Sequence, residues 1–84
     1  MFLHVTHVTY LKDYQLRLEF NDGRVKKLDL KDELYGEIFD PLRELEFFRK
    51  VAVNPATGTI EWPNGADFAP EFLYEIGQEV RKSA

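Results

Sequence analysis

Apolar and polar residues alternate near the start of the chain with the period of two that is typical of β-strands. Residues 14–20 show the pattern most clearly, because their apolar side chains fall on one face and their polar side chains on the other. The apolar face includes Leu16, Leu18 and Phe20. Residues 5–11 precede this segment and are rich in β-branched side chains, which favour extended structure. Two strands are therefore predicted.

A tight turn follows the second strand. The segment Asn21–Gly23 ends in a glycine, which accepts the positive φ angle of a hairpin turn, and residues 24–30 then resume an extended pattern. In this third strand Val25 falls on one face, whereas Leu28 and Leu30 fall on the other. Either a β-bulge or a strand that is covered on both faces accounts for this. The chain thus begins with a predicted meander of three strands.

Helical spacing replaces alternation in the middle of the chain. Residues 31–39 carry apolar side chains at intervals that suit one or two helical turns, despite Gly36. Asp40 and Pro41 then resemble a helix start, because a carboxylate accepts free amide hydrogens and a proline ring fixes φ near the helical value. A short helix over residues 42–46 is expected.

A second hairpin is predicted after this helix. Residues 47–53 return to strand composition, and residues 54–58 supply the Asn, Pro and Gly that are typical of turns. Residues 59–62 form the partner strand, with Ile60 and Trp62 on a common face.

The last predicted element is a helix that follows a sharp turn at residues 63–65. Pro70 suits its first turn, Leu73 and Ile76 supply apolar positions, and Gly77 marks its end. The complete order is β-β-β-α-β-β-α, which favours an α+β fold: a mostly antiparallel sheet of about five strands with short helices packed on one face. No repeat or linker divides the chain, so residues 1–84 are expected to form a single domain.

Composition narrows the classes of function. Hydrophobic residues make up 44% of the 84 positions, which is enough to build a core. Cysteine is absent, which excludes disulfides, thiolate zinc sites and cysteine nucleophiles. The chain lacks a long apolar run and a basic leader, so a cytoplasmic location is expected. A net charge of −4 argues against non-specific attraction to nucleic acid or anionic lipid and favours a basic partner.

Four stretches of the chain resemble a known family. The most specific is the run WPNGADFAPEFLY at residues 62–74. It is joined upstream by YQLRLEFNDG at residues 14–23, PLRE at residues 41–44 and FFRKVAVNPATGTIEW at residues 47–62. On these motifs most of the chain resembles the bacterial family catalogued as domain of unknown function 2442.

This resemblance implies a two-layer α+β fold, and it implies no activity, cofactor or catalytic residue. Members of the family are sometimes joined to a helix-turn-helix DNA-binding domain, and they often neighbour another small protein in bacterial operons. Such an arrangement suggests a toxin and antitoxin pair. Because the sequence ends at Ala84, shortly after the last matching motif, no appended helix-turn-helix domain is expected.

The loop after the second hairpin is the candidate binding site. Its residues Trp62, Asn64, Gly65 and Asp67 group a large amphipathic ring, a turn and a carboxylate within a short segment, and tryptophan frequently anchors protein interfaces. The alternative, which we favour, is structural. In it Trp62 fills the core, the turn residues shape the backbone, and Asp67 accepts hydrogen bonds from amides near the last helix.

Two further charged groups are candidates for binding. An acidic belt comprises Asp29, Asp32, Glu33, Glu37, Asp40, Glu44 and Glu46. Such a run is usually a solvated face, although a basic partner has a docking surface there. A smaller basic patch on the outer face of the sheet is expected from Arg17, Arg24, Lys26 and Lys27. It lacks the interleaved aromatic residues that stack on bases, and lysines that protect a strand edge explain it more simply.

The histidines do not suggest a metal site. His4 and His7 are three residues apart in a predicted strand, so their side chains point to opposite faces. No catalytic residue, metal or cofactor is therefore predicted. An enzyme that uses Asp67, His7 or Glu71 in a cleft beside the last helix remains an alternative.

A protein-interaction role is the function that these observations favour. We expect a small, non-catalytic module that binds another small protein, as the antitoxin-like or regulatory member of a bacterial operon pair. Besides the enzyme, the alternative is an accessory subunit of a DNA-binding regulator. Direct binding to nucleic acid or membrane is not expected. The identity of the partner and the oligomeric state stay open.

Overall fold

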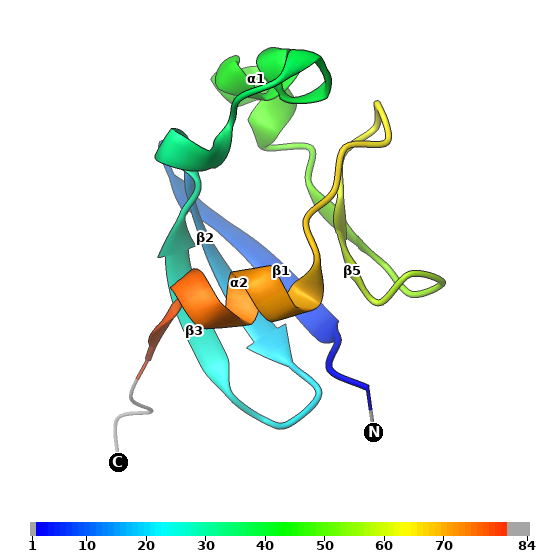
Figure 1. Cartoon of the computed structure of the whole chain (residues 1–84). Coiled ribbons are helices and arrows are strands. Elements are labelled where there is room, and N and C mark those ends of the chain that lie inside the picture. Colours follow the sequence, from blue (N-terminus) through cyan, green and yellow to red (C-terminus); the bar gives the residue numbers. More distant parts are fainter. Residues whose placement is uncertain (1, 81–84) are drawn as a thin grey trace.

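The meander predicted at the start of the chain forms the larger of two sheets (Figure 1). The computed structural model describes residues 2–80. Its first strands are β1 (Val5–Lys12), β2 (Gln15–Phe20) and β3 (Val25–Asp29), each antiparallel to the next. A fourth strand, β6 (Gln78–Glu79), pairs with the other edge of β3. The sequence did not predict β6, because two polar residues after a helix carry no strand signal.

The alternating residues of β2 point into the core, as predicted, and all three are buried. β3 pairs with β2 in unbroken register, which places Leu28 opposite Leu16 on the core face and Val25 opposite Glu19 on the outer face. Val25 is nevertheless buried, outside the main hydrophobic cluster of the described residues. The register excludes a bulge in β3, and the irregularities of this sheet lie in β1 instead. The outer face of β3 is covered at Val25 only, because Lys27 and Asp29 on the same face are exposed.

Short helical segments connect the two sheets. η1 (Lys31–Glu33) and η2 (Glu37–Arg43) are 3₁₀ helices, and α1 (Leu45–Phe48) is a single α-helical turn. Gly36 separates η1 from η2 because its φ of 99° lies in the left-handed region, which no helix uses. The predicted helical turns over residues 31–39 are thus present in the tighter 3₁₀ form.

Two boundaries predicted for this region are wrong. Pro41 does not begin a helix but lies inside η2, and α1 starts beyond it. The strand predicted over residues 47–53 is reduced to β4 (Ala52–Asn54), because Phe47 and Phe48 belong to α1. Phe48 is fully buried there, so the apolar composition of this stretch reflects core packing and not a strand.

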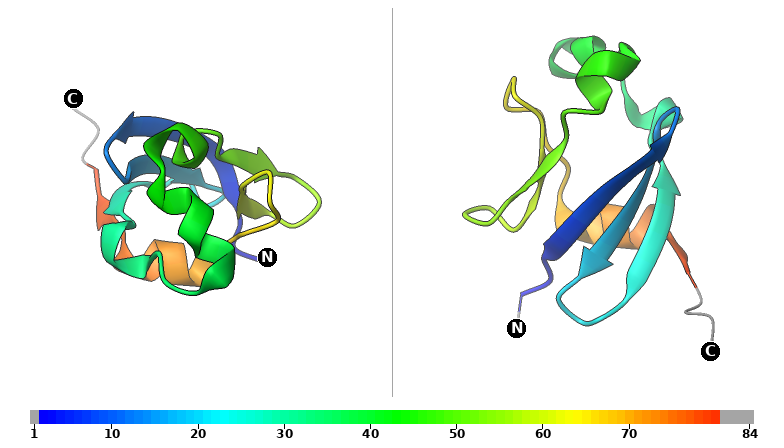
Figure 2. Two further views of the ribbon diagram at one scale, coloured as in Figure 1. Left: turned by 90° about the horizontal axis from the view of Figure 1, so that it is seen from above. Right: turned by 180° about the vertical axis from the view of Figure 1, so that it is seen from behind.

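The second hairpin is present as predicted but forms a sheet of its own. β4 pairs with β5 (Thr59–Glu61) across the turn at residues 54–58. Beside the start of β1, the amide of Val5 donates a hydrogen bond of 2.8 Å to the carbonyl oxygen of Gly58. Within residues 2–80, the prediction of one sheet of about five strands is therefore corrected to six strands in two sheets, one of four and one of two. Figure 2 shows the two sheets from above and from behind.

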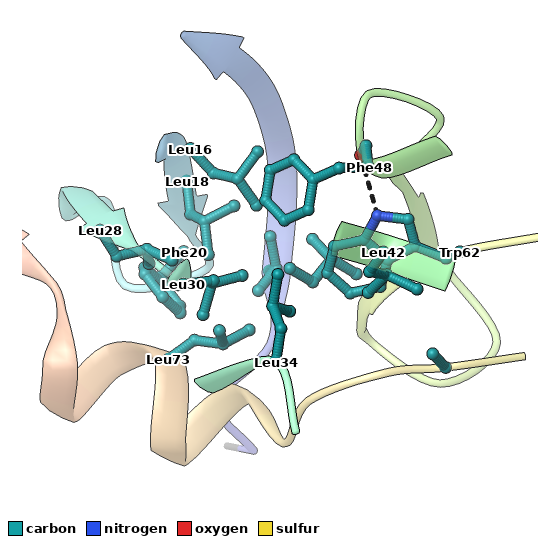
Figure 3. Packing of buried hydrophobic residues seen from close by; sticks show 13 residues of the cluster. Leu16, Leu18, Phe20, Leu28, Leu30, Leu34, Leu42, Phe48, Trp62 and Leu73 are labelled. Atoms are coloured by element: carbon teal, nitrogen blue, oxygen red, sulfur yellow. Dashed lines mark hydrogen bonds between the residues drawn. The ribbon is translucent and has the colours of Figure 1, made fainter. Parts of the chain in front are cut away.

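The last helix and a continuous hydrophobic cluster hold these parts together. α2 (Pro70–Ile76) begins at the predicted proline, ends before Gly77 and lies across the face of the larger sheet (Figure 1). Ten labelled members of the cluster are drawn in Figure 3; they are Leu16, Leu18, Phe20, Leu28, Leu30, Leu34, Leu42, Phe48, Trp62 and Leu73. The α+β prediction is confirmed. None of the helices within residues 2–80 is long and apolar enough to span a membrane.

Candidate functional site

The candidate loop is a tight turn that extends the second hairpin. The amide of Gly65 donates to the carbonyl oxygen of Trp62 at 2.9 Å, and the amide of Trp62 donates to the carbonyl oxygen of Ala66 at 2.9 Å. Gly65 has a φ of 87°, a value that favours glycine. The backbone bridge between Glu61 and Asp67 continues the pairing past the turn. The loop is therefore a fixed part of the fold.

Trp62 fills the core, as the structural interpretation expected. Its side chain is 1% exposed, and its indole Nε1 donates a hydrogen bond of 2.8 Å to the carbonyl oxygen of Phe48 (Figure 3). The ring also meets Phe68 edge to face, with centroids 5.9 Å apart. Because both the ring and its N–H group are used internally, the outer surface of the loop consists of other residues.

Asn64 connects the loop to η2. Its side-chain nitrogen donates to the carbonyl oxygen of Ile38 at 2.8 Å, and its side-chain oxygen accepts from the amide of Ala66 at 3.1 Å. Gly65 is exposed, and a Cβ built on it meets nothing within 4 Å. Asn64 thus positions the loop against residues 37–43, which sequence spacing did not indicate.

Asp67 does not cap the last helix. Ala69 occupies the N-cap position of α2, and no side-chain hydrogen bond caps it. The exposed side chain of Asp67 instead lines a surface hollow of about 300 Å³. We call this the aromatic hollow; its other lining residues include Glu33, Tyr35, Phe39, Phe68 and Phe72.

Three stacked rings form the aromatic hollow. The centroids of Phe39 and Phe68 are 4.8 Å apart with an interplanar angle of 24°, and those of Phe68 and Phe72 are 5.7 Å apart with an angle of 17°. Beside them Tyr35 is 69% exposed, and Ile38 in η2 is 49% exposed. This surface was not predicted from the sequence. Its only signal there was the pair Tyr35 and Ile38, two large apolar residues among polar neighbours.

The acidic belt lies at the surface near this hollow. All of its members except Glu33, which is half-buried, are exposed. Arg43, one of its few cations, has its Nε 4.0 Å from Asp40 Oδ1 and donates from the same atom to the carbonyl oxygen of Leu34 at 3.0 Å. Most of the belt's negative charge therefore faces solvent.

The basic patch is smaller than predicted because Lys26 lies on the opposite face. Its Nζ sits 3.8 Å from the ring centroid of Tyr74 and donates to the carbonyl oxygen of Tyr74 at 2.6 Å, beneath α2. The pairing of Leu18 with Lys26 places this residue on the core side of β3. Arg24 is paired with Asp22 and Glu79, which leaves Arg17 and Lys27, paired across β2 and β3 on the outer face.

A polar network fixes the end of α2 to the turn between β2 and β3. The hydroxyl of Tyr74 donates to Asp22 Oδ2 at 2.6 Å, and Arg24 pairs with Glu79 at 3.5 Å. The hydrogen bond from Tyr74 is the main reason that the pKa of Asp22 is lowered, with a further contribution from the Arg24 amide. The same bond raises the pKa of Tyr74.

The residues named for an alternative enzyme are not gathered into one site. His7 pairs with Glu19 on the outer face of the larger sheet, and its Nδ1 lies 3.4 Å from that carboxylate. His4 Nδ1 lies 3.2 Å from the carbonyl oxygen of Phe2. Asp67 lines the aromatic hollow, and Glu71 is exposed in the first turn of α2. Within residues 2–80 no three His, Asp or Glu side chains form a group suited to a metal ion.

Two comparisons with known proteins give matches. The family model described as Protein of unknown function (DUF2442) matches residues 5–79. A solved structure from Nitrosomonas europaea ATCC 19718, described as a "Putative DNA Binding Protein", is similar at 30% sequence identity and a TM-score of 0.66. The similarity covers 74% of this chain and 41% of that one. No curated protein matches the chain.

Proposed function

Because the chain belongs to the family of proteins of unknown function DUF2442, whose description assigns no activity, we propose a function from the surface that the fold presents. The chain is a small, non-catalytic protein-interaction module that binds a basic protein partner. It acts in the cytoplasm as the antitoxin-like or regulatory member of a bacterial operon pair.

The exposed apolar side chains beside the acidic belt carry this proposal. Tyr35 and Ile38 are 69% and 49% exposed, and both lie within the stretch of residues 29–46 that contains the belt. Large apolar side chains that are rimmed by charge are typical of interaction surfaces. The rim is acidic, and a partner of complementary positive charge associates faster and in a defined orientation.

Co-expression with the product of the adjacent gene tests the proposal. The two proteins are expected to co-elute in size-exclusion chromatography. The double variant Tyr35→Ser/Ile38→Ser is expected to weaken the complex about tenfold or more, since it removes two apolar contacts from the centre of the surface. Leu11→Ser is the matched control, because Leu11 is a similarly exposed apolar residue but lies in β1.

Two results contradict this proposal. One is the absence of a complex with the neighbouring protein when both are folded and soluble. The other is a complex that the double variant leaves as tight as before, while Leu11→Ser weakens it.

A second candidate function is suggested by the similar structure from Nitrosomonas europaea. That protein is described as a "Putative DNA Binding Protein", and this chain spans 41% of its length. In this proposal the chain is the accessory subunit of a DNA-binding regulator, and the partner supplies the DNA contacts. A measurement of the partner's affinity for its own promoter, with and without the chain, tests it. An unchanged affinity excludes the regulatory role.

A further inference from the structure

The aromatic hollow has a shape and chemistry that select among the side chains of a partner. Its volume of about 300 Å³ suits one long side chain and not an element of secondary structure. The stacked rings of Phe39, Phe68 and Phe72 supply flat aromatic surface, and the faces of such rings are electron-rich whereas their edges are electropositive. The hollow is therefore apolar inside while it remains open to solvent.

Two carboxylates from distant parts of the sequence line the same hollow. Glu33 ends η1, and Asp67 is the last residue of the candidate loop. Among the ion pairs found within residues 2–80, none involves either side chain. A cation that enters the hollow is thus next to two residues whose carboxylates have no ion pair of their own in this part of the chain.

We propose that the aromatic hollow binds an arginine side chain of the partner protein. A guanidinium group is planar, stacks on aromatic rings, is weakly hydrated and presents several N–H donors to carboxylates. A lysine ammonium is a strongly hydrated point charge, so it gains less from an aromatic surface. An uncharged apolar side chain leaves Glu33 and Asp67 without partners. Of these side chains, only arginine interacts favourably with both the aromatic rings and the two carboxylates.

The exposed residues next to the hollow extend this recognition. Tyr35 lines the hollow, and Ile38 lies at the place where Asn64 contacts η2. Apolar residues of the partner that flank the arginine are expected to pack on these two side chains. The inference rests on the proposed protein-binding function and specifies the chemistry of the partner.

Capped peptides provide a direct probe. The full chain, isotope-labelled, is titrated with acetyl-Gly-Leu-Arg-Leu-Gly-amide and with the same peptide carrying Lys or Gln in place of Arg. The arginine peptide is expected to shift the ring signals of Phe39, Phe68 and Phe72 saturably. It is expected to bind about twofold to fivefold more tightly than the lysine peptide, and the glutamine peptide more weakly still.

Variants that remove charge distinguish binding in the hollow from general attraction to the acidic belt. Glu33→Gln/Asp67→Asn is expected to lower the affinity for the arginine peptide about fivefold. Glu44→Gln/Glu46→Gln is the matched control, because it removes the same charge from exposed belt positions that do not line the hollow. This control is expected to change the affinity by less than about twofold.

The results decide the inference separately from the proposed function. Equal affinity for the arginine and lysine peptides, shifts spread along residues 29–46, or equal effects of the two double variants overturn the inference, since each indicates general attraction to the belt. If the neighbouring protein binds the Glu33→Gln/Asp67→Asn variant as tightly as the original chain, the hollow is not the contact, and the proposed function still stands. If the arginine peptide binds but the product of the adjacent gene does not, the proposed operon partner is wrong, and the inference that the hollow binds arginine still stands.

Discussion

Gly58 carries two constraints at a point where the two sheets meet. Its φ is 75°, and an added Cβ there would lie 2.8 Å from the Cβ of His4. Its carbonyl oxygen also accepts the hydrogen bond from the amide of Val5. Gly23 has a similar φ of 87°, but nothing lies within 4 Å of the corresponding position. A comparison of the same substitution at the two glycines therefore distinguishes the cost of backbone strain from the cost of a steric clash.

We expect Gly58→Ala to destabilise the protein more than Gly23→Ala does. Alanine at Gly23 adds only the strain of a left-handed conformation, about 1 to 2 kcal/mol. Alanine at Gly58 adds the same strain and also forces His4 away from the second hairpin, so the loss is expected to exceed about 2 kcal/mol. Urea unfolding measures both. Equal losses would mean that residue 4 moves aside without cost.

Trp62 is expected to stabilise the fold through its N–H group as well as its ring. Trp62→Phe keeps an aromatic side chain but leaves the carbonyl oxygen of Phe48 without its 2.8 Å donor. A buried acceptor without a partner costs about 1 to 3 kcal/mol, and the smaller ring adds a cavity. Circular dichroism during urea unfolding measures the change. As the control, Tyr35→Phe removes an exposed hydroxyl and should change stability by less than about 0.5 kcal/mol.

At the scale of elements, the hydrogen bond between Tyr74 and Asp22 attaches the last turn of α2 to the hairpin of β2 and β3. The pKa of Asp22 is lowered from 3.8 in the folded protein, chiefly by this bond. The carboxylate form is thus favoured by folding. Its stabilisation is present above pH 3.8 and is lost as the pH falls through the lowered pKa.

Tyr74→Phe is therefore expected to flatten the acid branch of the stability profile. Urea midpoints from about pH 2 to pH 7 should fall less steeply below pH 3.8 in this variant than in the original chain. Tyr10→Phe is the control, since Tyr10 packs against Phe48 and does not contact Asp22 in the described part of the chain. A Tyr74→Phe profile that keeps the original acid slope would show that other carboxylates determine it.

The elements that were predicted correctly are those whose sequence signals lie within the element itself or in the turn next to it. Alternation at Leu16, Leu18 and Phe20 with the glycine turn that follows predicted the first hairpin, and Pro70 predicted the start of α2. The strand β6 was missed because it exists only through its pairing with β3, which is remote in the sequence. Phe47 and Phe48 gave a wrong strand prediction because a helical turn and a strand that pack against a core have the same apolar composition.

For the candidate site as well, the sequence predicted the features that depend on neighbouring residues and missed those that depend on remote contacts. The turn at Asn64 and Gly65 and the burial of Trp62 followed from local chemistry. The aromatic hollow is assembled from η1, η2, α2 and the segment before α2, so no local pattern indicated that Asp67 and Glu33 line the same hollow. Sequence reasoning reached the residues of the loop but not the surface that they complete.

For the whole molecule, the distribution of charge predicts behaviour towards DNA. The net charge is −4. Lys26 lies on the opposite face and Arg24 is paired with Asp22 and Glu79, which leaves Arg17 and Lys27 as direct neighbours on the outer face of the larger sheet. Two adjacent cations with no aromatic ring between them lack a platform on which bases stack. We expect no detectable binding of this chain alone to random duplex DNA at about 0.15 M salt. Fluorescence anisotropy with a labelled duplex measures this. Saturable binding under these conditions would contradict the prediction and favour a direct role in DNA recognition.

The position of β6 has a consequence for the newly made chain. β3 completes its hydrogen bonding only when residues 78 and 79 arrive, although β1, β2 and β3 are synthesised first. Until then the ribosome-bound intermediate exposes an unpaired strand edge, and such edges recruit strands from other chains. Translation that stalls between residues 30 and 77 should therefore release a species prone to aggregation, and the two lysines at the edge of β3 provide electrostatic repulsion during that interval.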